Sequence, residues 1–168
     1  WCMPDILTLG KEGKADDVMR DIRVRSLWSP YYFTRVCLGY HDLVPHLHQK
    51  EMDLFIVNCE QGVRKHWIEW PRGFFKTTCF TVGCAMWFNL PFTDEDSRYA
   101  IDVLGIDEGA WLKRMELHSQ DWLNLLAFET FANAKKKVAI IRHHFESTGI
   151  FRAAFSEIAY TGSPEERP

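Results

Sequence analysis

The chain has 168 residues, of which 46% are apolar and 26% are charged, and its formal net charge at pH 7 is −3. This composition is typical of a globular domain, and the net charge excludes a basic surface over the whole molecule. The five cysteines show no paired spacing, which favours free thiols in a reducing interior. No apolar run approaches the roughly 20 residues that span a bilayer, so we expect no membrane segment. Because the first residue is Trp1, we expect the chain to be a piece of a longer reading frame.

The first half of the chain predicts two helices with a strand between them. Apolar residues recur at helical spacing from about Asp42, and Pro45 suits the first turn of that helix. Residues 65–70 are short and aromatic-rich and are bounded by a turn, which predicts a strand. Residues 77–90 contain no proline before Pro91, so the pattern predicts a helix that ends there.

The second half predicts further helix and one more strand. Residues 93–120 are charged and predict helix in part, and the apolar run 122–129 predicts a buried strand. The next helix has Thr130 as its expected N-cap and Gly149 as its expected end. Its apolar residues recur at steps of three and four and predict one continuous stripe, formed by Phe131, Ala134, Val138, Ile141 and Phe145.

Strand, loop, helix, strand and helix in this order predict an α/β fold. We therefore expect a three-layer α/β domain with a mostly parallel sheet. Residues 1–62 would form a mostly helical N-terminal segment, and residues 63–168 would form the first half of the α/β domain.

The segment "EWPRGFFKTTCFTVG" (69–83) carries the tail of a phosphate-binding loop. Measured against G-x-x-x-x-G-K-[ST], the chain keeps Lys76 and Thr77, but Trp70 and Phe75 stand where the two glycines are expected. In such loops backbone N–H groups and a helix N-terminus converge on phosphate oxygens, and the lysine bridges the terminal phosphates.

The surroundings of this loop fit the motif in two respects. Gly73 supplies a residue that accepts positive backbone angles, and Arg72 adds a second cation that suits a site stabilising transition-state charge. The alternative is a solvated basic turn between a strand and a helix. Glu69 argues for this alternative, because a charge in a central strand needs a partner or an edge position.

Two segments together resemble one family. "PRGFFKTT" (71–78) resembles the variant Walker A motif of large terminase subunits from tailed phages and proviruses, and residues 123–158 are similar to that family's second strand and long helix. Residues 38–55 also look like the segment before the loop in these ATPases. The resemblance implies an α/β domain of the P-loop NTPase type, of which residues 63–168 would be the first half. It also implies an ATP hydrolase that drives double-stranded DNA into a procapsid during viral genome packaging.

The resemblance implies ATP and Mg²⁺ as cofactors and gives the loop residues their roles. Lys76 would hold the β and γ phosphates, Thr77 would bind Mg²⁺, and Arg72 would be the loop arginine, which makes Arg72 and Lys76 the catalytic candidates. Gln49 is the candidate adenine contact. The ATP cradle would comprise Pro71, Arg72, Gly73, Phe74, Phe75, Lys76, Thr77 and Thr78.

The implied partners are double-stranded DNA, the portal and procapsid, and a small terminase subunit, with the chain in a homo-oligomeric ring on the portal. The implied location is the host cytoplasm.

A carboxylate motif for Mg²⁺ and the attacking water has two candidates. "VLGIDE" (103–108) has the letters but lies in a charged, helix-periodic stretch, and "LLAFE" (125–129) has Phe128 where the aspartate is expected. We expect the motif and the nuclease domain beyond Pro168. The fragment alone would then bind phosphate weakly and not hydrolyse ATP.

Other side-chain groups are open to two interpretations. Lys135–Lys137 with Arg142, His143 and His144 form a basic face that is either solvated or in contact with DNA phosphates or a neighbouring subunit. Cys79 is a core thiol whose place near a helix N-terminus allows modest reactivity. The histidines near Cys37 and Cys59 lack the spacing of a zinc site; they are His41, His46, His48 and His66.

Two further functions stay open. One is another P-loop ATPase of the helicase or kinase kind. The other is a non-enzymatic DNA- or capsid-docking module in which the "KTT" turn is incidental and replacement of Lys76 changes no binding property.

Overall fold

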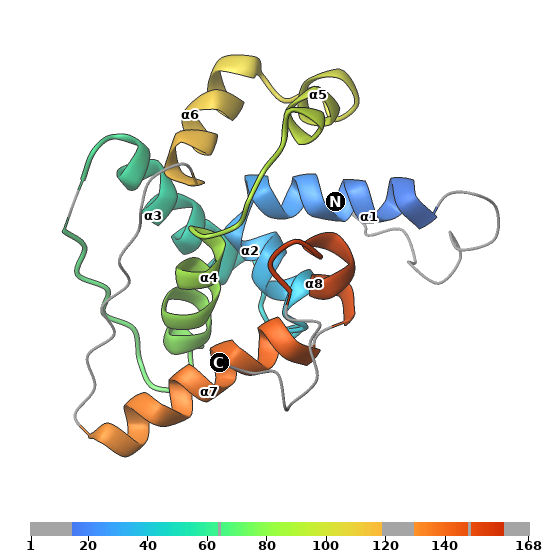
Figure 1. Cartoon of the computed structure of the whole chain (residues 1–168). Helices are drawn as coiled ribbons and strands as arrows, with labels where there is room; N and C mark the ends of the chain where they lie inside the picture. Colours follow the sequence, from blue (N-terminus) through green and yellow to red (C-terminus); the bar gives the residue numbers. More distant parts are fainter. Residues whose placement is uncertain (1–14, 64, 119–129, 148, 160–168) are drawn as a thin grey trace.

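The computed structural model describes residues 15–63, 65–118, 130–147 and 149–159, and the regular structure in these ranges is helical (Figure 1). The α-helices are α1 (Ala15–Trp28), α2 (Pro30–Tyr32), α3 (Lys50–Glu60), α4 (Ala85–Trp87), α5 (Asp94–Asp102), α6 (Glu108–His118), α7 (Phe131–Ser147) and α8 (Gly149–Ala154). Three π-helical segments join them, η1 (Phe33–Cys37), η2 (Pro45–Gln49) and η3 (Thr77–Cys84).

The predicted α/β fold with a parallel sheet is wrong, since the described ranges contain helices and no strand. Residues 65–70, predicted as a strand, form no regular secondary structure, and no described segment pairs with their backbone. A strand exists only where a neighbour completes its hydrogen-bond ladder, and the apolar pattern of 65–70 carries no information about a neighbour. The second predicted strand, 122–129, lies outside the described residues. Side chains of 65–70 still alternate, with His66, Ile68 and Trp70 half-buried and Lys65, Trp67 and Glu69 exposed.

The local signals for helices are confirmed. Pro45 opens η2, which runs into α3, and the predicted helix after the loop is present as η3 and α4, ending before Pro91. Residues 93–120 contain α5 and α6. Thr130 caps α7, because its hydroxyl accepts a hydrogen bond from the Asn133 N–H at 3.2 Å. Gly149 differs from the prediction, as it begins α8.

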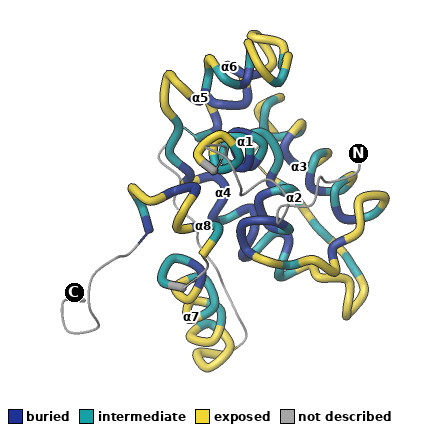
Figure 2. Tube along the Cα trace, turned by 90° about the vertical axis from the view of Figure 1, so that its right-hand side faces the viewer, coloured by how far each residue is buried: buried dark blue, intermediate teal, exposed yellow. Residues whose placement is uncertain are grey.

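The core lies where α1, α2 and α4 meet, whereas exposed residues follow much of α7 (Figure 2). Leu27 of α1 and Trp87 of α4 are fully buried there, and the Trp87 indole N–H donates to the Ser26 carbonyl oxygen at 2.8 Å. Phe33 packs edge-on against Phe151 of α8 with ring centroids 6.0 Å apart. The core therefore joins the first helices to the last one.

Arg23 of α1 ties three elements together. Its guanidinium contacts the Asp96 carboxylate of α5 at 3.0 Å and donates to the Ala154 carbonyl oxygen of α8 at 2.7 Å. It also donates to the Pro91 carbonyl oxygen at 3.0 Å and pairs with Glu157 at 2.6 Å. Asp96 is 3% exposed, so its negative charge depends on this partner.

Gly83 in η3 marks a close approach between two helical segments. A Cβ added at Gly83 would lie 2.1 Å from the Thr34 hydroxyl oxygen and 3.1 Å from the Thr78 carbonyl oxygen. Thr34 is fully buried in η1, and its hydroxyl is fixed by a 2.7 Å hydrogen bond to the Pro30 carbonyl oxygen. Only glycine fits at position 83.

His118 at the end of α6 is held in its neutral form. Its ring packs against Trp87 with centroids 4.2 Å apart, and its Nε2 lies 3.2 Å from the Leu27 carbonyl oxygen. Burial lowers the pKa of His118 to about 4, although the Leu27 carbonyl partly offsets that effect and the nearby Arg114 adds to it.

We expect this histidine to make stability fall in acid. The unfolded chain binds a proton at His118 near pH 6.5, and the folded chain does so only near pH 4. Unfolding therefore takes up a proton in that window, and the free energy of unfolding falls as pH drops from 6.5 to 4, by about 3 kcal/mol in total. Urea unfolding at several pH values measures this loss. A His118→Gln variant should show a flatter profile in the same window, and an unchanged slope would contradict the assignment.

Candidate functional site

The predicted loop is an exposed turn between residues 65–70 and η3. The Phe74 N–H donates to the Pro71 carbonyl oxygen at 3.4 Å, and the Cys79 N–H donates to the Phe75 carbonyl oxygen at 2.8 Å. Gly73 has φ 87°, which glycine adopts without strain. The loop thus turns at Gly73 and enters the helix after Phe75.

Phe75 also has a positive φ, 55°, the left-handed conformation that bulky residues rarely adopt. It occupies the position of the second glycine in the phosphate-loop motif. The next residue, Lys76, returns to the right-handed region at φ −49° and ψ −48°. A left-handed residue followed by a right-handed one aims successive backbone N–H groups toward one point, and this arrangement binds anions in many proteins.

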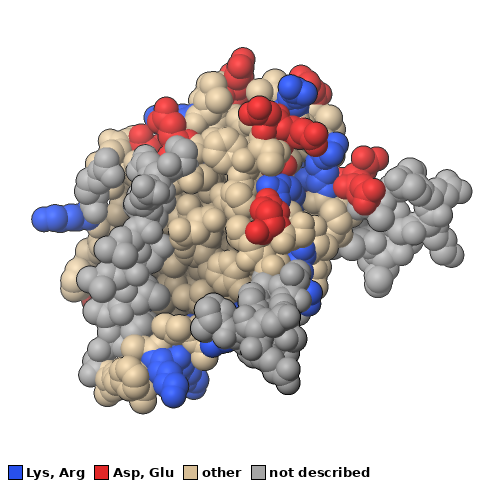
Figure 3. Space-filling view, viewed as in Figure 1, with Lys and Arg blue, Asp and Glu red and all other residues tan. Residues whose placement is uncertain are grey.

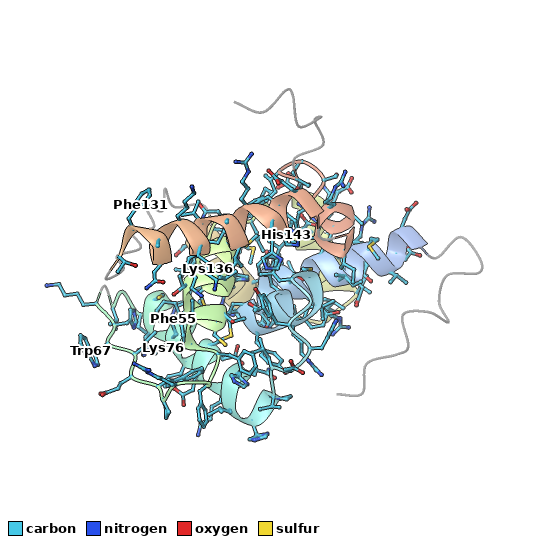
Figure 4. The ribbon with its side chains drawn as sticks, turned by 90° about the horizontal axis from the view of Figure 1, so that it is seen from below. Phe55, Trp67, Lys76, Phe131, Lys136 and His143 are labelled. Carbon is cyan, nitrogen blue, oxygen red and sulfur yellow. The ribbon has the colours of Figure 1, made fainter. Side chains whose placement is uncertain are left out.

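The loop presents two cations beside this backbone. Arg72 and Lys76 are both exposed, and Lys76 directly precedes η3 (Figure 4). Thr77 and Thr78 are half-buried in the first turn of η3, where helical N–H groups lack partners within the helix. Lys76, Thr77 and Thr78 thus lie at the start of this helical segment, and Arg72 lies in the turn before it. η3 is itself a π-helical segment, a geometry that recurs at functional sites.

Aromatic rings form the inner wall of the loop. The Phe75 ring meets His48 of η2 with centroids 5.6 Å apart, and the Trp70 ring meets the same histidine at 5.7 Å. Trp70 also packs edge-on against Phe80 at 5.4 Å. The two residues that replace the motif's glycines thus share one buried histidine.

The predicted adenine contact, Gln49, is engaged elsewhere. Its side chain hydrogen-bonds Asp53, an interaction that lowers the pKa of Asp53 against the larger raising effect of burial. His48, the neighbouring residue, is the one that faces the loop. No sequence pattern indicates this, because which of two adjacent residues points inward depends on how η2 packs.

The carboxylate candidates do not gather at the loop in the described residues. The Asp107 carboxylate accepts a 2.8 Å hydrogen bond from the Ala110 N–H and so caps α6, and Glu108 is exposed. Residues 125–129 lie outside the described ranges. Within those ranges, no group of three or more His, Cys, Asp or Glu side chains is placed to hold a metal ion.

Cys79 is a core thiol, as expected, and its surroundings do not favour reactivity. The thiol is fully buried in η3, and burial raises its pKa to about 12. A thiol with such a pKa is protonated at neutral pH, and the thiolate is the reactive form. Cys79 is therefore an inert core residue.

Only part of the predicted basic face of α7 is exposed to solvent. Lys135 and Lys136 are exposed and Lys137 is half-buried, whereas His144 is buried and its Nε2 lies 3.0 Å from the Tyr40 hydroxyl. Figure 3 shows Lys and Arg side chains at the end of the molecule where α7 begins, and Asp and Glu side chains over α5 and α6. Lys136 and His143 border a groove of about 460 Å³ between α7 and Leu38–Tyr40.

The predicted apolar stripe of α7 is buried only in part. Ala134, Ile141 and Phe145 are half-buried, while Phe131 is 84% exposed and Val138 is 59% exposed. The first two turns of α7 therefore carry apolar side chains toward solvent.

Over the described helices, none is both long and apolar enough to cross a membrane. A comparison with known protein families, with curated proteins and with solved structures finds no match.

Proposed function

We propose that residues 71–78 hold the phosphates of ATP, and that the chain provides ATP-binding residues of a DNA-packaging motor similar to the large terminase subunit. The observation that carries this proposal is the left-handed backbone of Phe75, φ 55°, at the motif position of a glycine. A bulky residue in that conformation costs on the order of 1–2 kcal/mol, and such strain concentrates at functional sites. The positive φ at Phe75, where the motif has a glycine, supports the proposal that this backbone binds phosphate.

The exposed cations support the same proposal. Neither Arg72 nor Lys76 forms an ion pair within the described ranges. Lys76 would bind the β and γ phosphates of ATP. Arg72 would neutralise the negative charge that develops on the γ-phosphoryl group during hydrolysis. Thr77 is the first residue of η3, so its hydroxyl is a candidate Mg²⁺ ligand beside the proposed phosphate site. A single protein ligand suits this ion, because Mg²⁺ takes most of its other ligands from phosphate oxygens and water. Bound Mg²⁺ would neutralise phosphate charge.

The proposal extends to partners and location. The motor would move double-stranded DNA with the portal, procapsid and small terminase subunit, as a ring of copies in the host cytoplasm. The exposed Lys135 and Lys136 of α7 support a contact with DNA phosphates, since lysines that neutralise phosphates provide most non-specific affinity.

Titration of the chain with Mg²⁺ and ATP tests the proposal. We expect Lys76→Ala to weaken binding by about tenfold to a hundredfold, because it removes a charge-assisted contact to the phosphates. Lys113→Ala is the matched control: Lys113 is an exposed lysine on α6, and its loss should leave affinity within about twofold. Calorimetry measures both. Equal affinities for the two variants would show that the loop is an incidental basic turn.

The second candidate function is a docking module that acts through α7. The exposed fractions of Phe131 and Val138, 84% and 59%, favour it, because large apolar side chains at a surface mark many contact sites. This candidate predicts that Lys76→Ala changes no binding property and that Phe131→Ser weakens association with the partner.

A further inference from the structure

Trp67 and Phe131 are the two most exposed large apolar side chains in the described ranges, at 91% and 84%. Aromatic side chains carry the largest apolar surfaces, so a ring left in water forgoes the largest gain from burial. Neither ring is part of the core, and Figure 4 shows both at the same end of the molecule. The two rings are therefore open to a ligand that approaches from solvent.

Each ring has an exposed lysine beside it. Lys65 and Trp67 occupy exposed positions of a run in which exposed and half-buried side chains alternate. Lys135 follows Phe131 by one turn of α7, so the two exposed side chains lie on one face of that helix. Neither lysine forms an ion pair within the described ranges. The surface thus presents the same unit twice, an aromatic ring with a cation next to it.

The charge around these two units is mainly positive. From Phe131 to Arg142, α7 contains no acidic residue, and Asp and Glu side chains gather over α5 and α6 instead (Figure 3). Glu69 is the exception, because it is the next exposed side chain after Trp67. This end of the molecule therefore attracts anions, and one carboxylate beside Trp67 opposes them.

We infer that Trp67 and Phe131 stack on unpaired bases of a single-stranded nucleic acid. Lys65 and Lys135 bind the phosphates next to those bases. Each unit of ring and lysine matches one repeat of such a strand, since every nucleotide offers a flat base and a negative phosphate. The inference goes beyond the proposed function, which gives α7 a contact with the phosphates of double-stranded DNA.

Other ligand classes fit these rings less well. In a duplex the faces of the bases are stacked on their neighbours, and only unstacked bases can pack on an aromatic side chain. A membrane or an apolar protein surface requires a contiguous apolar patch. Trp67 instead stands between two charged side chains, Lys65 and Glu69, on the exposed side of its run.

Fluorescence anisotropy of a labelled oligothymidylate of about 16 nucleotides tests the stacking contact. Trp67→Ala and Phe131→Ala should each weaken binding by about tenfold, and Trp67→Phe should stay within about threefold because it keeps a ring. Leu112→Ala is the matched control. It removes another exposed apolar side chain, 54% exposed on α6, and should leave the affinity within about twofold. Circular dichroism checks that each variant keeps its helices, and Phe131→Ala carries the test if Trp67→Ala does not fold.

A duplex of the same length separates stacking from charge. Duplex binding depends on the lysines and not on the rings, so Trp67→Ala should change it by less than about twofold. Equal oligothymidylate affinity for Trp67→Ala and the unchanged chain overturns the inference. An equal loss for strand and duplex also overturns it, because the ring would then serve a contact that needs no unpaired base.

Two further results check the class of ligand. Glu69→Gln should strengthen strand binding by about twofold, because it removes a negative charge near the phosphates, and weaker binding would contradict the placement of phosphates beside Trp67. Vesicles of phosphatidylcholine and phosphatidylserine test the membrane alternative. Vesicle binding that is lost in Trp67→Ala, with no binding of the strand, overturns the inference. None of these experiments uses ATP, so the inference and the proposed phosphate site can fail independently.

Discussion

Replacing Arg23 by alanine is expected to lower the free energy of unfolding by about 3–5 kcal/mol. The change leaves the Asp96 carboxylate, 3% exposed, without its cation, and an uncompensated buried charge is among the most destabilising defects in a protein. It also removes the hydrogen bonds from Arg23 to the Ala154 and Pro91 carbonyl oxygens. α1 therefore loses a contact with α8 and a contact with the segment that precedes α5. Urea unfolding followed by circular dichroism measures the loss.

Arg20→Ala is the matched control for this experiment. Arg20 lies one helical turn before Arg23 and pairs with Glu95 at 3.1 Å, but the two side chains are 48% and 72% exposed. Exposed pairs contribute about 1 kcal/mol or less. If Arg20→Ala and Arg23→Ala destabilise the chain equally, burial of the Arg23 pair has no energetic role.

The second large effect is expected at Gly83. Gly83→Ala should lower the free energy of unfolding by about 3 kcal/mol, because overpacking a filled interior forces backbone or side chains to shift. The added Cβ would stand 2.1 Å from the Thr34 hydroxyl oxygen, and that hydroxyl cannot move without breaking its bond to the Pro30 carbonyl oxygen. Thermal or urea unfolding gives the value.

A double-mutant cycle identifies the clash as the cause. In a Thr34→Ala background the same change at Gly83 should cost less than half as much, because the obstructing atoms are gone. Gly149→Ala is the glycine control: no heavy atom lies within 4 Å of its added Cβ, and its effect should stay within about 0.5 kcal/mol. An equal loss at Gly83 in both backgrounds would contradict the close approach of η3 and η1.

Helices were predictable here because their signals are local. Pro45, Pro91 and Thr130 mark ends through the geometry of one or two turns, and each stands at or near a helix end in the structure. The absence of a sheet from the described residues was not predictable, since a run such as 65–70 becomes a strand only when a distant segment pairs with it. Exposed and half-buried side chains alternate along 65–70, but the sequence of this run carries no information about a pairing segment.

The candidate site was likewise predictable only in part. The motif selected Lys76 and Thr77 as candidates by their spacing, and Gly73 was expected to accept a positive backbone angle, which it does at φ 87°. The left-handed backbone of Phe75 goes against the preference of its own side chain, so local reasoning predicts the opposite. His48 is 27 positions before Phe75 in the chain, and only the packing of η2 behind the loop brings the two rings together.

Phe75 also bears on the entropy of ligand binding. A loop with glycine at that position samples many conformations when it is empty, and the ligand must then select one of them. With its ring held against His48, Phe75 confines the loop before any ligand arrives. The ordering is completed during folding of the chain, so less conformational freedom would remain to be lost on binding of the proposed phosphate ligand. A bulky residue in place of glycine can in this way favour a preorganised loop.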